Sequence, residues 1–298
     1  MKVMGSRVGH IFRLCVASLG DLFFPRMCLV CGSKLDIGVR HICPRCADDI
    51  PFTYFWGWEG NPAEQRLAAL AHIDEACSLF FYRRDSSFSR LIHQFKYGGD
   101  IRLGRRLARM LGEYMADVSR QRALPEGRVA PSVPKESQLC VLPEGAVAEG
   151  AFAPSVPKES QLCALPEGAQ TKSAPGRFRG IDAVVPVPLH PLKKFRRGFN
   201  QSDVIARELA AALGAAFEPK LIRRRRYTRT QTRTDDRRRN MAGAFALNER
   251  VLRSLHAAGV QRILLVDDVL TTGSTIAAAA AVLPSSFRLS AATLACVE

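Results

Sequence analysis

The spacing of apolar residues over the first 120 positions predicts three helices and a strand. Residues 10–24 have the spacing of a short amphipathic helix, which Pro25 ends. Residues 76–82 are aromatic and apolar and predict a strand, and a helix over 87–96 is closed by a turn of two glycines. A longer helix follows over 101–119. Its core face consists of Leu103, Leu107, Met110, Leu111 and Tyr114.

The second half of the chain predicts strands that alternate with helices. Residues 181–188 form a buried-strand pattern whose prolines stand at its end, where strand pairing stops. Residues 263–266 form a continuous apolar strand. The other predicted elements are a helix over 203–213, a helix over 275–283 and a strand near 291–297. Because strands and helices alternate, the expected fold class is α/β, a parallel sheet flanked by helices.

A repeated segment separates these two halves. Eleven residues from Ala130 to Cys140 recur unchanged from Ala153 to Cys163, a period of 23. A solenoid is one alternative, but fewer than three full copies and regularly placed prolines disfavour it. We interpret residues 121–176 as a duplicated, disordered insertion without identifiable chemistry.

Composition narrows the class of protein. A chain of 298 residues, 47% of them hydrophobic, is long enough for one main domain and a small accessory unit. The formal charge of +15 favours a partner with negative charge, such as a nucleotide, a sugar phosphate or nucleic acid. Arg13 and Asp21 interrupt the apolar N-terminal stretch, so we expect it to be neither a membrane span nor a secretory signal. We therefore expect a cytoplasmic protein.

Four of the nine cysteines form two Cys-x-x-Cys pairs, Cys28 with Cys31 and Cys43 with Cys46. Four thiolates in a tetrahedron are what structural zinc takes, and a full set of sulfurs leaves no open position for a catalytic water. The alternatives are a redox pair or unconnected buried thiols, and nearby His41 could replace one sulfur. We expect a zinc-ribbon-like module over residues 20–52, in a reducing compartment.

An acidic pair, Asp267 and Asp268, follows the apolar strand and precedes a loop of small hydroxylated residues that opens a helix. That loop consists of Thr271, Thr272, Gly273, Ser274 and Thr275. Backbone N–H groups at a helix start favour a phosphate, whereas adjacent carboxylates need ribose hydroxyls or magnesium beside them. The alternative is that the loop only caps a helix and the aspartates only end a strand. It would explain the loop or the acidic pair alone, but not a strand, an acidic pair and such a loop in succession.

Basic residues occur in two further loops. Arg196, Arg197 and Gly198 follow the strand at 181–188 and suit a diphosphate, since arginine grips it bidentately and glycine lets the backbone approach. A solvated charged loop is the alternative. Residues 223–239 contain nine arginines, which could close over a pyrophosphate or follow a nucleic-acid backbone.

These motifs resemble, in order, those of the ComF family, competence-associated proteins with a type I phosphoribosyltransferase domain. The matching features are the paired cysteines, the turn from Phe95 through Lys96 to Asp100, the basic loop and the acidic pair with its hydroxyl loop. The resemblance covers about 20–120 and 178–298. The chain departs from the family pattern in the insertion and at Thr234, where leucine is usual.

The resemblance implies a phosphoribosyltransferase-like domain over 76–298 that binds phosphoribosyl pyrophosphate with Mg²⁺. By this likeness Asp267 and Asp268 contact the ribose, the hydroxyl loop holds the 5-phosphate, and Lys96 belongs to the substrate site. It further implies a role in DNA uptake, with single-stranded DNA as a partner and a helicase or recombination protein docked by the zinc module. Three readings stay open: transfer of phosphoribosyl groups, a non-catalytic DNA-binding or docking factor, and a sensor without turnover.

Overall fold

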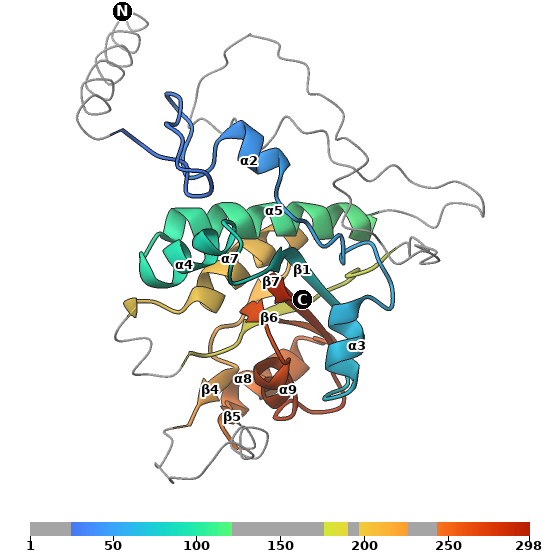
Figure 1. Ribbon diagram of the computed structural model, residues 1–298. Helices are drawn as coiled ribbons and strands as arrows, with labels where there is room; N and C mark the ends of the chain where they lie inside the picture. Colours follow the sequence, from blue (N-terminus) through green and yellow to red (C-terminus); the bar gives the residue numbers. More distant parts are fainter. Residues whose placement is uncertain (1–24, 121–175, 190–196, 226–242) are drawn as a thin grey trace, which may run out of the picture. The chain divides into compact units, whose positions relative to one another are not determined.

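A five-stranded sheet forms the centre of the larger of two units in this computed structural model, which describes residues 25–120, 176–189, 197–225 and 243–298 (Figure 1). Its strand order is β1-β7-β6-β2-β3, and every pair of neighbours is parallel. The strands are β1 (Glu75–Tyr82), β2 (Ala183–Pro186), β3 (Ala216–Phe217), β6 (Arg262–Leu270) and β7 (Arg288–Val297). The predicted parallel sheet is therefore confirmed.

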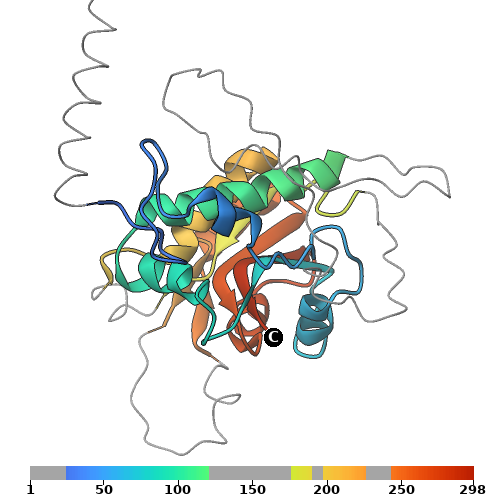
Figure 2. The same cartoon turned by 45° about the horizontal axis from the view of Figure 1, so that its top comes forward.

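Helices flank this sheet on both faces (Figures 1 and 2). The long helix α5 packs along α7, and α7 lies over β2 and β6, whereas α9 packs on β6 from the other side. The helices of this unit are α3 (Pro62–Ala68), α4 (Ser89–Tyr97), α5 (Ile101–Arg120), α7 (Gln201–Leu213), α8 (Glu249–Ala257) and α9 (Ser274–Ala280). This arrangement confirms the α/β class.

The core lies between the sheet and the α5–α7 layer. Residues Ile263–Val266 of β6 are fully buried, as expected of a central parallel strand that is covered on both faces. The predicted core face of α5 is buried except at Tyr114, whose half-buried ring stacks on Trp56 with 4.6 Å between centroids. Gly112 of α5 lets α7 approach closely, because a Cβ there would lie 2.7 Å from the Cβ of Ala212.

Two elements extend farther than the sequence predicts. β6 continues through Leu270, and β7 begins at Arg288, because these strands pair with each other as far as Leu270 and Cys296. β2 stops earlier, at Pro186 opposite Val266. The C-terminal ends of β6 and β7 therefore project past β2.

A separate two-stranded antiparallel ribbon joins β4 (Ile222–Arg224) to β5 (Phe245–Leu247). The arginine-rich residues 226–242 between them lie outside the described part of the chain. The same holds for the predicted helix over 10–24 and for 121–175 of the expected insertion.

The chain re-enters the sheet after the insertion at a tightly bonded point. Arg177 is 4% exposed and pairs with the buried carboxylate of Glu64, and its Nε donates to the Trp56 carbonyl at 3.2 Å. The N–H of Phe178 donates to both carboxylate oxygens of Glu75, at 3.1 and 3.0 Å. These bonds fix residues 176–180 to the start of the sheet.

The smaller unit, in its described part, covers residues 25–50 and contains the helix α2 (Pro44–Asp48). The larger unit begins at Pro51 and thus includes a stretch for which the sequence predicts no element. The expected domain boundaries at 20–52 and 76–298 stay predictions. Among the described residues, no helix has both the length and the apolar character needed to span a bilayer.

Candidate functional site

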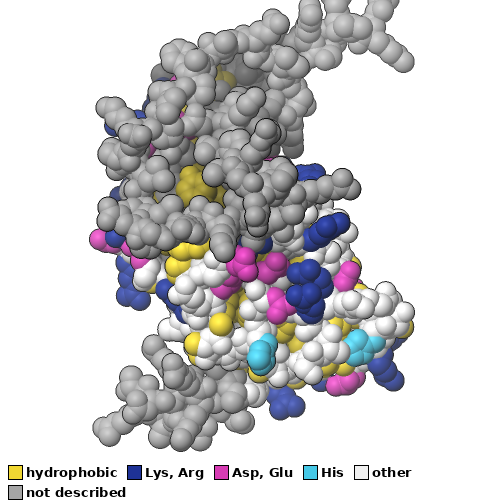
Figure 3. Space-filling model, turned by 90° about the vertical axis from the view of Figure 1, so that its right-hand side faces the viewer, with side chains coloured by type: hydrophobic (Ala, Val, Ile, Leu, Met, Phe, Trp, Pro, Cys, Tyr) yellow, Lys and Arg dark blue, Asp and Glu magenta, His cyan; other side chains and the backbone are white. Residues whose placement is uncertain are grey.

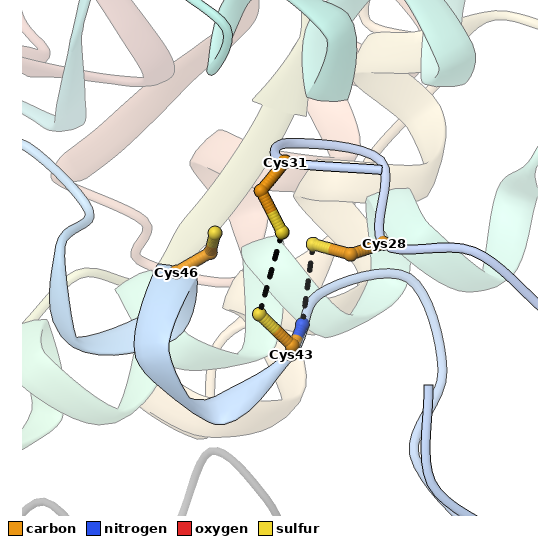
Figure 4. Close-up of side chains that lie close together, drawn as sticks. All are labelled: Cys28, Cys31, Cys43 and Cys46. Atoms are coloured by element: carbon orange, nitrogen blue, oxygen red, sulfur yellow. Dashed lines mark hydrogen bonds between the residues drawn. The ribbon is translucent and has the colours of Figure 1, made fainter. Parts of the chain in front are cut away.

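The four paired cysteines come together in the smaller unit (Figure 4). The sulfur atoms of Cys28, Cys31, Cys43 and Cys46 all lie within 4.8 Å of one another, and those of Cys31 and Cys43 are 3.8 Å apart. Four sulfurs around a zinc ion at its usual bond length would be about 3.8 Å apart. The thiols are free rather than joined in disulfides. The grouping predicted from their spacing is confirmed.

Local backbone geometry places each pair. In the first, Gly32 takes a positive φ of 73°, which glycine adopts without strain, and its N–H donates to the Cys28 carbonyl at 2.9 Å. In the second, Cys43 stands at the N-cap of α2 and Cys46 lies one turn into the helix. A tight turn and a helix start therefore each direct two sulfurs toward one point.

Hydrogen bonds prepare some of these thiols to ionise. The hydroxyl and N–H groups of Ser33 lower the pKa of Cys31 to about 6. Burial acts to raise the pKa of Cys28, but backbone N–H groups outweigh it and lower the value. Burial and the neighbouring thiols raise the pKa of Cys46. Since zinc takes thiolates, a bound ion would reverse the effect at Cys46. The four thiols fit a metal such as zinc.

The acidic pair lies at the projecting end of β6 in the larger unit. Asp267 is paired with Thr293 of β7, and β2 has already ended one position earlier on the other side. The carboxylates thus stand at the carboxyl edge of the parallel strands, where ligands of open α/β sheets bind. The strand continues through both aspartates rather than ending before them, so the pair is held by strand pairing as well as by the loop that follows.

The two carboxylates differ in their partners. The Nζ atom of Lys96, from the last turn of α4, lies 2.9 Å from Oδ1 of Asp268. Oδ1 of Asp267 instead accepts from the Ser202 hydroxyl at 3.2 Å and from the Asp268 N–H at 2.9 Å. Burial, and next the charge of Asp268, raise the pKa of Asp267 to about 7, against the opposing effect of its hydrogen bonds and Lys96. Near neutral pH Asp267 therefore lies close to its own pKa, and a cation bound beside it would favour its ionised form.

The hydroxyl loop follows at once and leads into α9. Gly273 is the N-cap of this helix with φ 80°, and its carbonyl accepts the N–H of Ala277 at 2.9 Å. The hydroxyls of Thr272 and Ser274 lie 2.8 Å apart. The structure thus places Thr271 to Thr275 as a turn at a helix start, the conformation that the sequence predicts for a phosphate-holding loop.

Of the predicted basic residues, the structure describes Arg197 and Gly198, whereas Arg196 lies outside the described residues. The Arg197 guanidinium stands over the ring of Tyr97, 4.8 Å from its centroid, and donates to Oε1 of Gln201 at 3.1 Å. Tyr97 is the neighbour of Lys96. The end of α4 therefore brings one cation to Asp268 and supports a second. Gly198 has φ 78°, as a tight turn requires.

Ser202, a neighbour of Asp267, is absent from the sequence prediction, and Arg224 enters it only as part of the arginine-rich residues 223–239. Ser202, in the first turn of α7, bonds Asp267 from 65 positions away. Arg224, from β4, stands over the ring of Phe245. Burial lowers the pKa of Arg224, and the charge of Asp267 acts in the opposite direction. The available signals for these two residues were the polar position of Ser202 directly after Gln201 and the arginine run that begins at Arg223.

On the face seen in Figure 3, acidic and basic side chains lie next to one another among the described residues. The charged side chains of the described residues therefore do not form a single-sign patch in the visible part of that face.

Comparison with known proteins identifies several relatives. The DNA utilization protein YhgH of Salmonella typhi is 44% identical over 98 residues, which are 32% of this chain and 40% of that protein. Competence protein F of Haemophilus influenzae is 37% identical over 97 residues, 32% of this chain and 41% of that protein. YhgH of Escherichia coli K12 is 39% identical over 98 residues.

No family model matches the chain. The matched region spans about two fifths of the length of the curated relatives. Identity near 40% to proteins with these names, together with the cysteine cluster and the parallel sheet, supports the assignment of this chain to the ComF family.

Proposed function

We propose that the larger unit binds phosphoribosyl pyrophosphate with Mg²⁺ at the carboxyl end of β6. The observation that carries this proposal is the sequence of groups along one stretch of chain: two carboxylates on a projecting strand end, followed by a hydroxylated turn at a helix start. Sugar hydroxyls match the first group and a phosphate matches the second.

Each part of the ligand has a partner of suitable chemistry. Asp267 and Asp268 accept hydrogen bonds from the ribose hydroxyls, and Thr271–Thr275 receive the 5-phosphate. Arg197 and Gly198, with Arg196, bind the diphosphate. Lys96 balances the charge of Asp268, which otherwise would repel the ligand. Magnesium, when bound with the ligand, neutralises charge on the diphosphate.

The proposed reaction is transfer of the phosphoribosyl group. A nucleophile forms a bond to C1 of the ribose while the bond from C1 to the pyrophosphate oxygen breaks, and the pyrophosphate leaves with the bonding electrons. The carboxylates stabilise the positive charge that develops on the sugar, and the cations stabilise the leaving group. Release of pyrophosphate in the presence of a nucleophile is therefore the direct sign of turnover.

We propose further that the protein serves DNA uptake or DNA use in the cytoplasm, and the support is that its relatives are named for DNA utilization and for competence. In this role the cysteine unit holds structural zinc and docks a helicase or recombination protein. The support is the four-thiol group, which fits a closed metal site.

A second candidate function is binding of single-stranded DNA without turnover. The observation that favours it is the run Arg223–Arg225, of which Arg223 and Arg225 are exposed at the end of the β4–β5 ribbon. Arginines at such a place can neutralise successive phosphates of a single strand. A third reading, a sensor that binds phosphoribosyl pyrophosphate without transferring it, shares the site of the first.

Isothermal titration of phosphoribosyl pyrophosphate with Mg²⁺ tests the site. Wild type should bind, and the double variant Asp267→Asn/Asp268→Asn should lose binding. Asp117→Asn, at an exposed carboxylate of α5, is the matched control and should bind as wild type does. Equal weak heats for wild type and the double variant would overturn the assignment of the site.

Pyrophosphate release then separates the enzyme from the sensor. The wild type is incubated with phosphoribosyl pyrophosphate, Mg²⁺ and a panel of nucleobases and amines. Acceptor-dependent release that is lost in the double variant supports transfer. Tight binding with no release for any acceptor favours the sensor.

Salt dependence tests the DNA candidate. Affinity for a single strand should fall steeply with salt, and glutamine at Arg223–Arg226 should flatten the slope by about 0.7 for each phosphate that is no longer neutralised. Glutamine at Arg250 and Arg253, exposed on α8, controls for a general decrease in charge. A slope that is the same in both variants would count against this candidate.

A further inference from the structure

The short helix α3 packs against the start of β1, at the edge of the sheet. β1 is an edge strand, and Nδ2 of Asn61 donates to its Ala76 carbonyl at 2.8 Å, while the N–H of Ala76 donates to Oε1 of Glu64 at 3.1 Å. Oδ1 of Asn61 also caps α3 by accepting the N–H groups of Ala63 and Glu64. Asn61 is fully buried and Glu64 is 8% exposed. These bonds fix α3 to β1 and satisfy edge groups that would otherwise lack partners.

From this fixed helix, Arg66 reaches the hydroxyl loop. Its Nη1 donates to the carbonyl of Thr271 at 2.7 Å and to the carbonyl of Val297 at 2.8 Å. Thr271 begins the loop after β6, and Val297 ends β7. A single guanidinium nitrogen thus ties the loop to the end of the neighbouring strand and to α3. No part of the proposed ligand needs to contact this side chain.

The loop also rests directly on α3 by close packing. A Cβ at Gly273 would lie 2.9 Å from Cδ2 of Leu67 in α3 and 3.2 Å from Cδ1 of Leu70 just after it. Leu67 is fully buried. There is therefore no room for a side chain at position 273, and contact with the two leucines determines how closely the loop approaches α3.

The carbonyl of Thr271 and the N–H of Thr272 belong to one planar trans peptide, so they point in opposite directions. When Arg66 holds the carbonyl toward α3 and β7, the N–H of Thr272 is directed away from them. Without that bond the peptide can rotate as a unit and turn its carbonyl outward. A carbonyl oxygen facing a phosphate repels it, whereas an N–H attracts it.

We propose that Arg66 is a positioning residue for the hydroxyl loop, which fixes the Thr271–Thr272 peptide in the orientation that receives the 5-phosphate. This inference rests on the proposed function for the identity of the ligand. It adds α3, an element N-terminal to the sheet, to the parts of the chain that determine affinity for a sugar phosphate.

The test compares Arg66→Met, which keeps most of the apolar stem and removes the donors, with Arg66→Lys, which keeps one charged nitrogen. Arg253→Met, at an exposed arginine that bonds a carbonyl of its own helix α8, is the control. Titration with ribose 5-phosphate should show binding about tenfold weaker or worse in Arg66→Met, as expected for removal of charge-assisted hydrogen bonds. Arg66→Lys should lie between wild type and Arg66→Met.

Titration of pyrophosphate with Mg²⁺ distinguishes positioning of the loop from a general structural defect, because a general defect would weaken binding of both ligands. Its ligands are in the basic loop rather than the hydroxyl loop, so its Kd should change less than about twofold in Arg66→Met. An unchanged Kd for ribose 5-phosphate would overturn the proposal, and so would an equal loss for both ligands. If Arg66→Met does not fold, Arg66→Lys decides. A loss of affinity confined to ribose 5-phosphate in Arg66→Lys supports the proposal, and the absence of such a selective loss overturns it.

Amide hydrogen exchange distinguishes failure of this inference from failure of the proposed function. If wild type binds neither phosphoribosyl pyrophosphate nor ribose 5-phosphate, the proposed function fails. Exchange at residues 271–275 of the unliganded protein then decides the role of Arg66. Faster exchange in Arg66→Met than in Arg253→Met supports fixation of the loop, and equal exchange overturns it.

Discussion

The cysteine cluster and the acidic site are built from very different separations along the chain. The cluster is complete between Cys28 and Cys46, and two local turns bring its sulfurs together. The acidic site combines the pair Asp267–Asp268 with Lys96, which bonds Asp268, and with Ser202, which bonds Asp267, and only the sheet and its helices bring these residues together. Spacing alone therefore predicts the first site in full, whereas it predicts only the central stretch of the second.

Removal of one thiol should have a large effect that is confined to the cysteine cluster. Cys28→Ser should lose stoichiometric metal and unfold the unit of residues 25–50, because structural zinc contributes about 10–16 kcal/mol to folding of small zinc-bound modules. Metal analysis by mass spectrometry and limited proteolysis would measure both effects. The affinity for phosphoribosyl pyrophosphate should stay at the wild-type value, since the acidic site is in the other unit.

The matched control for that variant is Cys140→Ser, at a cysteine without a partner at ligand spacing in the sequence. It should keep the metal. Full retention of zinc by Cys28→Ser would contradict a four-thiolate site, and loss of ligand affinity would contradict the independence of the two units.

A second prediction concerns the stability of the acidic site as pH changes. Because burial and Asp268 raise the pKa of Asp267 from 3.8 to about 7, its folded value exceeds its unfolded value. Such a carboxyl contributes stability that is fully present below the unfolded pKa and is lost as pH rises through the folded one. The unliganded protein should thus lose stability between these two values, and Asp267→Asn should lose less.

Thermal unfolding at two pH values would measure this. At pH 8 the Asp267→Asn variant should melt several degrees above wild type, and near pH 4 the gap should close. Asp117→Asn, at an exposed carboxylate, should show no such trend. A gap between Asp267→Asn and wild type that is the same at both pH values would show that the carboxyl is not perturbed as described.

A third prediction concerns close packing between the hydroxyl loop and α3. Gly273→Ala should cost about 1–3 kcal/mol, because alanine must adopt a positive φ and its methyl group meets Leu67. Gly214→Ala, at the C-cap of α7, shares the positive φ but has no atom within 4 Å of the added Cβ. The larger loss for Gly273→Ala in chemical denaturation would measure the crowding alone, and equal losses would contradict it.

The smallest expected effect belongs to the support of Arg197. Tyr97→Leu removes the ring beneath the guanidinium, and an exposed cation–π contact is worth about 0.5–1 kcal/mol. Binding of pyrophosphate should weaken by about two- to fivefold in titrations. Tyr97→Phe keeps the ring and should bind as wild type does, and an equal loss in both variants would assign the effect to the hydroxyl group instead.

The sequence predicts the parallel fold because its buried strands are continuous apolar runs, as in residues 263–266. It does not predict how far β6 extends, since that depends on pairing with β7 through Leu270. The short helix α3 is also missed, because its seven residues carry too few apolar positions for periodicity. The Asn61-Pro62 pair, a capping residue followed by proline at the first helical position, was the available signal.

The neighbours of the acidic pair show the same limit. Lys96 enters the sequence prediction only through a family resemblance, Arg224 enters it only as one of the nine arginines of residues 223–239, and Ser202 does not enter it. Each lies on a different element, and no local pattern of residues encodes the distance between elements. The sequence does indicate which chemistry must surround the acidic pair and the hydroxyl loop, namely cations and hydrogen-bond donors.

The buried Arg177–Glu64 pair and the bonds from Phe178 to Glu75 have a consequence for how this protein can vary between species. They fasten the chain where it resumes after the repeat, so the sheet does not depend on the intervening residues for its alignment. Lengthening a connection between two fixed ends costs little, about 0.6 kcal/mol for each doubling. We therefore expect a longer connection between α5 and β2 to cost the fold little, and we expect the same place to tolerate a break in the chain or a fused reporter.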